Sequence, residues 1–179
     1  MNKKKLNYRV TYLEMNRKPS FDWPKNLKHK LSILLAESFP AWYFLFFYKQ
    51  VGKNYYWTDW LRKSEDEIDE FVNDKNVLLY TLIKDGWPVG FYMLDYRKKD
   101  ICDLSFFGLV DEVIGIGLGK YLLQTAILTA WDNKKIKKLT VNTCSLDHKS
   151  AIYLYQKYGF TPVKYKAVSY THLTLPTIF

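Results

Sequence analysis

The chain has 179 residues, 48% of them hydrophobic, which is enough for one domain with a substantial core and too little for two. Its longest apolar run, at 39–48, is about half as long as a membrane-spanning helix requires, and no apolar stretch follows the lysines at 3–5, so we expect a cytoplasmic protein without a signal peptide or a membrane partner. The formal charge of +9 is compatible with a nucleic-acid partner, but the lysines at 134–138 lack interleaved aromatics. For the role of the lysine clusters we therefore rank solvated surface first, the rim of an anion site second and a nucleic-acid patch last.

The first part of the chain contains one clear strand signal and two helix signals. Apolar and polar residues alternate over 6–15, which predicts a strand, whereas 27–39 fits a helix or a strand and stays open. The aromatic segment 41–51 is predicted to be helical and to end at Gly52. A second helix is predicted over 64–72, because its first serine and the glutamate three residues on form a capping box that satisfies free amides of the first turn.

A β-hairpin and a third strand are predicted next. Residues 77–84 and 88–96 have the composition of strands and are joined by Asp-Gly at 85–86, a pair that favours a tight turn between antiparallel strands. Residues 101–110 are expected to form the third antiparallel strand. Apolar residues then recur at helical spacing over 117–131, which predicts a helix.

The remaining elements complete a mixed α/β pattern. Residues 138–144 are predicted to be a strand and 149–158 a helix that stops at Gly159, with a further strand after it. The strands at 101–110 and 138–144 are joined through a helix, and a connection of this kind places its two strands side by side and parallel. We therefore expect an α/β fold that contains one parallel strand pair.

The segment between the third strand and the helix that follows it is dense in glycine. Gly115, Gly117 and Gly119 have no side chains to hinder close approach, so the amides of the first helical turn can face a ligand. The helix dipole favours a negative charge at that place. The pattern therefore predicts a site for a molecule that carries a pyrophosphate.

Two common nucleotide sites do not fit this loop. A Walker loop needs Ser or Thr after its lysine, and Lys120 is followed by Tyr121. A dinucleotide fold needs G-x-G-x-x-G with an acidic residue about 20 positions on, whereas the spacing here is G-x-G-x-G and the residue in that place is Leu139. A nucleotide triphosphatase and a dinucleotide enzyme are both disfavoured.

With these residues in view, the chain resembles a known family. The strand, the glycine loop and a helix that opens on Leu122 and Leu123 are similar to the acetyl-coenzyme A signature, (Gln/Arg)-x-x-Gly-x-Gly/Ala, of the GNAT superfamily of N-acyltransferases. The segment A-I-Y-L-Y-Q-K-Y-G-F at 151–160 is similar to that superfamily's later helix, and the likeness is strongest over 101–165, in a form similar to an uncharacterised bacterial branch. One departure is Ile114, which stands where Gln or Arg is usual, so the glycines must hold the anion without a polar side chain at the start of the loop.

The resemblance implies a fold and a co-substrate. The fold would be a mixed, mostly antiparallel sheet with flanking helices, in which the parallel strand pair splays apart and admits the pantetheine arm of acetyl-CoA. No metal is needed for the reaction. The backbone of the strand before the loop would bond the pantetheine amides as an added strand would, and the loop amides would bond the pyrophosphate. The cofactor-binding residues implied in this way are Phe107, Gly108, Leu109, Gly115, Ile116, Gly117, Leu118, Gly119, Lys120 and His148.

Tyr155 matches the family residue that protonates the coenzyme A thiolate. A phenol with a pKa of about 10 can give a proton to a thiolate without being charged at rest. The alternative is that Tyr155 is one of 15 tyrosines and packs the core. With the motif around it, we prefer the catalytic role.

Three residues are candidates for the base that deprotonates the incoming amine. His148 falls where many family members have an asparagine that touches the cofactor, and for this histidine we prefer cofactor contact, or a place at the start of the last helix with Asp147 as its N-cap, to base catalysis. Asp103 lies on the strand before the loop, where family members often carry a carboxylate, and Glu112 is a further candidate. Each carboxylate on its own is favoured as structural.

The C-terminal residues are treated separately. Residues 168–178 look like the conceptual translation of a sequencing-library adapter, so the acyltransferase domain is assigned to 1–166 and an artefactual tail to 167–179. On this interpretation the chain lacks the last native strand of the fold and leaves an unpaired sheet edge. The alternative is that 168–179 forms one more strand, as its β-prone residues allow.

The expected function is transfer of an acetyl group from acetyl-CoA to a primary amine of a small molecule or peptide, by direct attack, in a monomer or homodimer. One alternative is a module that binds acyl-CoA without turnover, which Ile114 favours; a less favoured one is a basic nucleic-acid-binding adaptor. Cys102 and Cys144 are expected to be free thiols, and Cys144 has no neighbouring base motif that would make it an acyl carrier. The acceptor pocket would be formed by an aromatic set for which packing of the helices onto the sheet is the preferred interpretation: Trp42, Tyr43, Phe47, Tyr55, Tyr56 and Trp57.

Overall fold

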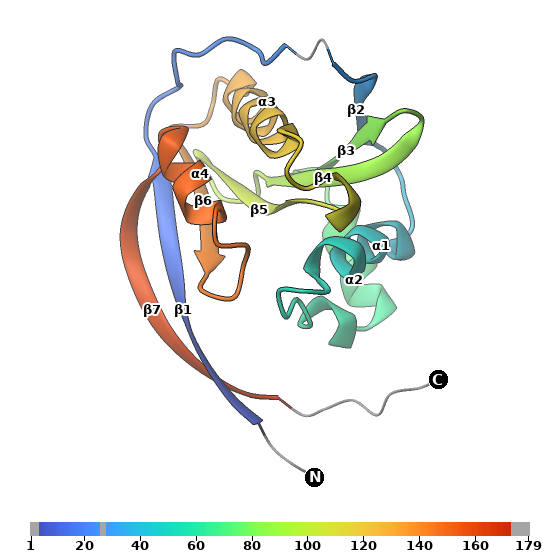
Figure 1. The fold of residues 1–179 in the computed structure, drawn as a ribbon, viewed down its shortest axis with the longest axis vertical. Helices are drawn as coiled ribbons and strands as arrows, with labels where there is room; N and C mark the ends of the chain where they lie inside the picture. The colour runs from blue at the N-terminus through green and yellow to red at the C-terminus, as the bar shows by residue number, and fades with distance from the viewer. Residues whose placement is uncertain (1–3, 26–27, 173–179) are drawn as a thin grey trace.

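The structure is a computed structural model that describes residues 4–25 and 28–172 (Figure 1). The residues from 173 onward, which include most of the tail predicted at 167–179, lie outside this part of the chain. The described strands are β1 (Lys4–Met15), β2 (Leu31–Ala36), β3 (Val77–Lys84), β4 (Trp87–Asp95), β5 (Ile101–Leu109), β6 (Lys138–Cys144) and β7 (Thr161–His172). The helices are α1 (Ala41–Gly52), α2 (Glu65–Val72), α3 (Leu118–Asp132) and α4 (Ala151–Lys157), with short 3-10 turns η1 (Trp60–Arg62) and η2 (Asp111–Val113).

Within the described residues, the strands form one seven-stranded sheet in the order β2-β3-β4-β5-β6-β1-β7. Every neighbouring pair is antiparallel except β5 and β6, which are parallel and joined through α3. This is the mixed, mostly antiparallel sheet with flanking helices that the sequence predicted. None of the helices in the described part of the chain is long and apolar enough to cross a membrane.

The parallel pair stays together over only a short distance. Its register joins Ile101 to Lys138, Cys102 to Leu139 and Asp103 to Thr140, and beyond these residues β5 continues only with β4 while β6 continues only with β1. The predicted splay of the two strands is confirmed. Their C-terminal halves therefore leave backbone groups on facing edges that no neighbouring strand pairs.

The helices cover both faces of the sheet and give the protein two core clusters. Figure 1 shows α3 on one face and the α1–α2 pair on the other. On the α3 face, Leu122 and Ala126 are fully buried against the sheet. On the opposite face, Phe44, Phe47 and Val51 of α1 are buried at the spacing of three and four residues that puts them on one side of a helix. The cores hold β4 and β5 between them, so the end of β5 has a fixed position.

Two local signals produce the structures that they predict. Ser64 and Glu67 form the capping box at the start of α2: the Ser64 amide donates to Glu67 Oε2 at 2.9 Å, and the Glu67 amide donates to Ser64 Oγ at 3.2 Å. Asp85 and Gly86 join β3 to β4 with φ angles of 51° and 91°. Both angles lie in the left-handed region that a tight hairpin turn of this hand requires.

Three parts of the prediction are changed or resolved. In the open segment 27–39, the described residues from 28 onward contain a strand, β2, and no helix. The last helix begins at Ala151, two residues later than expected. The strand after Gly159, β7, continues through Val168 to His172 and pairs with β1 along its whole length, so the residues at 168–172 are strand, as one of the two interpretations held. The adapter origin of the tail, and a further native strand beyond it, stay predictions.

Candidate active site

The glycine loop joins η2 to α3 through two left-handed residues. Gly115 has a φ of 88° and Gly117, the N-cap of α3, has a φ of 89°. Residues other than glycine rarely adopt such angles, so the path of the loop depends on these two positions. A Cβ atom added at either glycine would meet no protein atom within 4 Å, so open space lies in front of both.

Among the residues that the structure describes, the amides of this loop have no acceptor. No side chain caps α3. In the described part of the chain, the last backbone bond donated before the helix is that from the Ile114 amide to Asp111 O at 3.2 Å, and none of the non-helical backbone bonds is donated by residues 115–120. Gly115, Ile116 and Gly117 are exposed to solvent. Free amides at the N-terminus of a 15-residue helix favour an anion, and the anion site at this loop stays a prediction.

A cavity of about 470 Å³ lies beside this loop, and we call it the loop cavity. Its walls come from the end of β5, the glycine loop, the start of α4 and the connection 53–59 that follows α1. Most of the predicted cofactor-binding residues lie together on these walls: Phe107, Gly108, Leu109, Gly115, Gly117, Gly119, Lys120 and His148. Two do not. The Ile116 side chain lies in a neighbouring groove, and the Leu118 side chain is buried, so only its amide could contact a ligand.

Tyr155 lies on the wall of the loop cavity and is almost completely buried. Its ring packs edge-on against Phe107 at 6.1 Å and Phe160 at 5.8 Å between centroids. Burial raises the pKa of the phenol above its usual value, and the negative charge of Asp147 raises it further. The side chain therefore both packs the core and forms part of the cavity wall, and its phenol keeps its proton.

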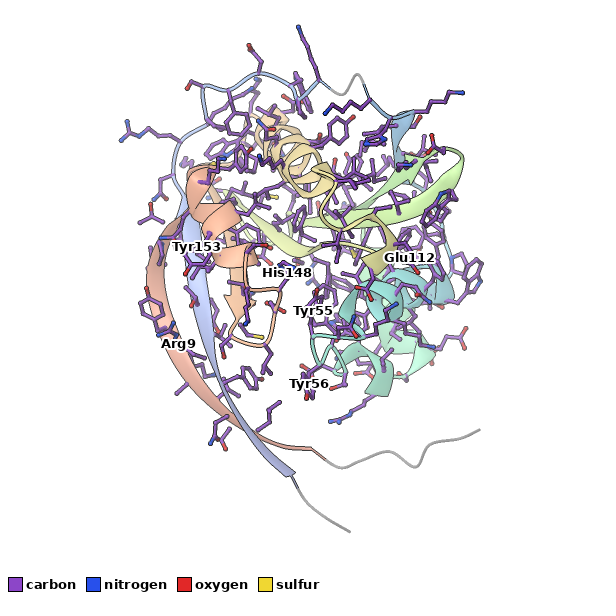
Figure 2. The ribbon with its side chains drawn as sticks, viewed as in Figure 1. Arg9, Tyr55, Tyr56, Glu112, His148 and Tyr153 are labelled. Atoms are coloured by element: carbon purple, nitrogen blue, oxygen red, sulfur yellow. The ribbon has the colours of Figure 1, made fainter. Side chains whose placement is uncertain are left out.

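His148 is at the mouth of the loop cavity and is exposed. Its Nδ1 atom accepts a hydrogen bond from the Ser150 amide at 3.3 Å and is 2.7 Å from Ser150 Oγ. Figure 2 shows Tyr55 and His148 directed toward each other from the two sides of the opening, and their rings are 6.2 Å apart. The histidine thus lies two residues before the N-cap of α4, Ser150, and helps to satisfy an amide there.

Asp147 does not cap α4, which corrects the sequence interpretation. The N-cap is Ser150. The Asp147 carboxylate instead accepts hydrogen bonds from Thr143 Oγ1 at 2.7 Å, the Cys144 amide at 2.8 Å and Trp57 Nε1 at 3.2 Å. These bonds tie the end of β6 to the 53–59 connection across the splayed strands. The sequence does not display this role of Asp147, because a partner ninety residues away leaves no local signal.

The two carboxylates proposed as bases are not on the cavity walls. Asp103 belongs to the last paired position of β5 and β6, where it accepts bonds from Thr140 Oγ1 at 2.5 Å and Ser105 Oγ at 2.8 Å. Its visible role is to hold the two strands at the point where they diverge. Glu112 is exposed on η2, away from the His148 side of the opening (Figure 2). Neither is among the residues that line the loop cavity.

A second cavity of about 330 Å³ adjoins the first, and we call it the aromatic cavity. The two share three lining residues, Tyr55, Trp57 and Asp147. Alternate residues of one face of β1 form one wall, and the 53–59 connection forms another. Cys144 also lines it, as a free thiol whose pKa is raised by burial and by Asp147, which argues against a nucleophile.

The predicted aromatic set divides between this cavity and other places. Tyr55, Tyr56 and Trp57 line the aromatic cavity, and their contact with an acceptor stays a prediction. The other three do not line it, and for Phe47 and Tyr43 the preferred interpretation, packing, agrees with the structure. Phe47 is buried in the core beneath α1, and Tyr43 packs against it and bonds Thr81 Oγ1 at 2.8 Å. Trp42 lies on the outer side of the helix with 66% of its surface exposed.

Basic side chains lie at the other end of the glycine loop. A groove beside Gly117 is lined by Lys25, Lys28 and His29 from the segment before β2 and by Lys120 from α3. These residues surround the free amides with positive charge. The arrangement agrees with an anion site that has a basic rim.

Comparisons with known proteins point to one family. A family model described as "Acetyltransferase (GNAT) family" matches residues 36–160. A GNAT-family acetyltransferase structure from Novosphingobium aromaticivorans is 14% identical with a TM-score of 0.63, over 94% of this chain and 66% of that one. A GNAT-family acetyltransferase from Elizabethkingia anophelis with acetyl-CoA bound is 24% identical with a TM-score of 0.54, over 75% and 78%.

A protein of unknown function from Staphylococcus epidermidis has a similar fold, with 13% identity and a TM-score of 0.61 over 91% of this chain and 61% of that one. The chain thus spans less than two thirds of the length of the first structures that it matches. None of the curated proteins matches it. At these identities the structural likeness shows the fold alone.

Proposed function

Because the chain belongs to the acetyltransferase (GNAT) family, we propose that it transfers an acetyl group from acetyl-CoA to a primary amine by direct attack. One observation carries this proposal. The acceptor-free amides of residues 115–120, the unpaired edge of β5 and the buried phenol of Tyr155 all border the loop cavity, which opens where the parallel strands part. Each of these three features would contact acetyl-CoA or take part in acyl transfer from it.

The residues present fit such a co-substrate. Open space in front of Gly115 and Gly117 leaves room for phosphate oxygens against the loop amides. Backbone groups at 107–109, unpaired on the side facing β6, would bond the amides of the pantetheine arm. Lys25 and Lys120 would face the remaining phosphate charge. When bound, acetyl-CoA supplies the activated acyl group.

Tyr155 is proposed as the proton donor to the leaving thiolate. The burial that raises the pKa of the phenol keeps it protonated near neutral pH. A thiolate released into the same apolar cavity would be poorly solvated and therefore a stronger base than in water, which favours the transfer. His148 is proposed as a contact at the cavity mouth, and Asp103 as the residue that holds the strand separation on which the site depends.

A second candidate is a module that binds acyl-CoA without turnover. It is favoured by the absence of Asp103 and Glu112 from the lining of the loop cavity, by the bonding of His148 Nδ1 to Ser150, and by the apolar Ile114 at the start of the loop. Both candidates predict binding of coenzyme A. Only the enzyme releases free thiol from acetyl-CoA when an amine is added.

The experiment combines calorimetric titration of coenzyme A with a thiol-release assay over a panel of amines. For Tyr155→Phe we expect coenzyme A affinity within twofold of wild type and a kcat lower by about 100-fold or more, which is the usual contribution of a general acid. Tyr153→Phe is the matched control, because Tyr153 lies on the outer side of the same helix with 71% of its surface exposed (Figure 2). Thiol release by Tyr155→Phe at the wild-type rate would remove the assigned role.

A further inference from the structure

The aromatic cavity has a charge opposite to that of the chain. The protein carries a formal charge of +9. Yet of the described residues that line this cavity, two are aspartates, Asp59 and Asp147, and none is lysine or arginine. A strongly basic protein that surrounds a cavity with acidic and aromatic groups creates a local site for cations.

Asp147 lies where the aromatic cavity adjoins the loop cavity. It lines both cavities, and three donors reach its carboxylate: Thr143 and Cys144 at Oδ2, and Trp57 at Oδ1. A carboxylate has room for about four hydrogen bonds, so these donors fix its position and leave capacity for one more. A neutral amine at the junction of the cavities can donate the fourth hydrogen bond and keeps the lone pair that attacks the thioester.

Asp59 lies on the wall of the aromatic cavity only, in the turn before η1. Its charge reaches the cavity: the phenol of Tyr48, which also lines the wall, has its pKa raised to about 12 by burial and, further, by Asp59. Arg62, the nearby cation, has the opposite and smaller effect on that pKa. The part of the wall that the loop cavity does not share is therefore negative as well.

Apart from the two aspartates, the wall is largely aromatic. The rings include those of Tyr12, Tyr48, Tyr55, Trp57, Trp60 and Phe106. Figure 2 shows Tyr55 and Tyr56 on the connection that closes this side of the opening. Aromatic faces attract ammonium groups and also cover alkyl chains, so such a wall accepts a molecule that is apolar in the middle and cationic at its ends.

We propose that the acceptor is an alkyl diamine or polyamine, with its reactive amine at Asp147 and a distal ammonium held at Asp59. This inference rests on the proposed function, since it names the acceptor class of that same site. A cavity of about 330 Å³ is large enough for such a short chain. An acceptor with a distal carboxylate in place of the ammonium would be repelled by the negative charges of Asp59 and Asp147.

The test compares three acceptors of equal chain length: 1,4-diaminobutane, n-butylamine and 4-aminobutanoate. We expect kcat/KM to be at least tenfold higher for the diamine than for butylamine, and lowest for 4-aminobutanoate. In Asp59→Asn the advantage of the diamine over butylamine should shrink at least fivefold. Glu37→Gln, which removes an exposed acid between β2 and α1, should leave that advantage unchanged.

Binding gives a readout that does not depend on turnover. Calorimetric titration of 1,4-diaminobutane into the protein with coenzyme A present should show saturable binding that Asp59→Asn weakens at least fivefold. Equal use of the three acceptors, or diamine binding that Asp59→Asn leaves unchanged, would overturn the inference while the acyltransferase proposal stands. Failure of coenzyme A itself to bind would instead overturn the proposed function.

Discussion

Replacing Gly117 by alanine separates the anion-binding role of the glycine loop from its structural role. The φ of 89° at Gly117 is strained for alanine, and the added Cβ would meet no protein atom within 4 Å. The structural cost is therefore backbone strain alone, about 1 kcal/mol, or a fall in Tm of about 2–4 °C for a chain of this size. Gly86, with a φ of 91° and equally open surroundings in the β3–β4 turn, is a matched control for that cost.

The effect on coenzyme A binding should differ between the two variants. The new Cβ at 117 would occupy the space where phosphate oxygens approach the amides, and losing one charge-assisted hydrogen bond costs about 1.5–3 kcal/mol. The Kd for coenzyme A should rise by about 10- to 100-fold in Gly117→Ala. It should stay at the wild-type value in Gly86→Ala. Calorimetry measures the Kd and thermal unfolding measures the strain; equal Kd values in the two variants, with equal losses of Tm, would refute the reasoning.

Three further predictions concern packing, capping and pH. In Gly108→Ala the new Cβ would lie 2.2 Å from Val51 Cγ1, so urea unfolding should show a loss of about 1–3 kcal/mol that the added change Val51→Ala partly restores; unchanged stability would contradict the close approach of α1 and β5. Ser64→Ala removes the capping box of α2 and should cost about 1 kcal/mol in the same assay, whereas Ser20→Ala at an exposed site should cost nothing measurable. Because the pKa of Tyr48 is raised from 10.0 to about 12 in the folded protein, the unfolded chain loses this proton at a lower pH. The free energy of unfolding should therefore decrease as pH rises from 10 to 12, and it should decrease less steeply in Tyr48→Phe. Equal slopes for the two proteins would refute this prediction.

The elements that the sequence predicted well are those with local causes. Ser64 and Glu67 are close in sequence, Asp85-Gly86 sets its own turn, and the glycines at 115 and 117 are required by the loop's φ angles. The segment 27–39 lacks such a cause. Its strand β2 exposes both Leu34 and Leu35, so the alternation is broken, and it is a strand because β3 pairs with it.

The grouping of the candidate residues was predicted in part for the same reason. Residues 107–109 and the glycine loop line one cavity, because one continuous stretch of chain forms that wall. The role of Asp147 depends on Trp57, and the division of the aromatic set depends on which side of α1 each ring occupies. Long-range contacts of this kind leave no spacing that a single sequence displays.

The central claim is that the amides of residues 115–120 hold the phosphates of coenzyme A. Nuclear magnetic resonance of the ¹⁵N-labelled protein, titrated with coenzyme A, tests it most directly. The account predicts large, saturable shifts of the 115–120 amide signals, while the signals of Asp85 and Gly86 in the distant hairpin turn stay in place. Saturable binding that leaves the 115–120 signals unmoved would contradict it.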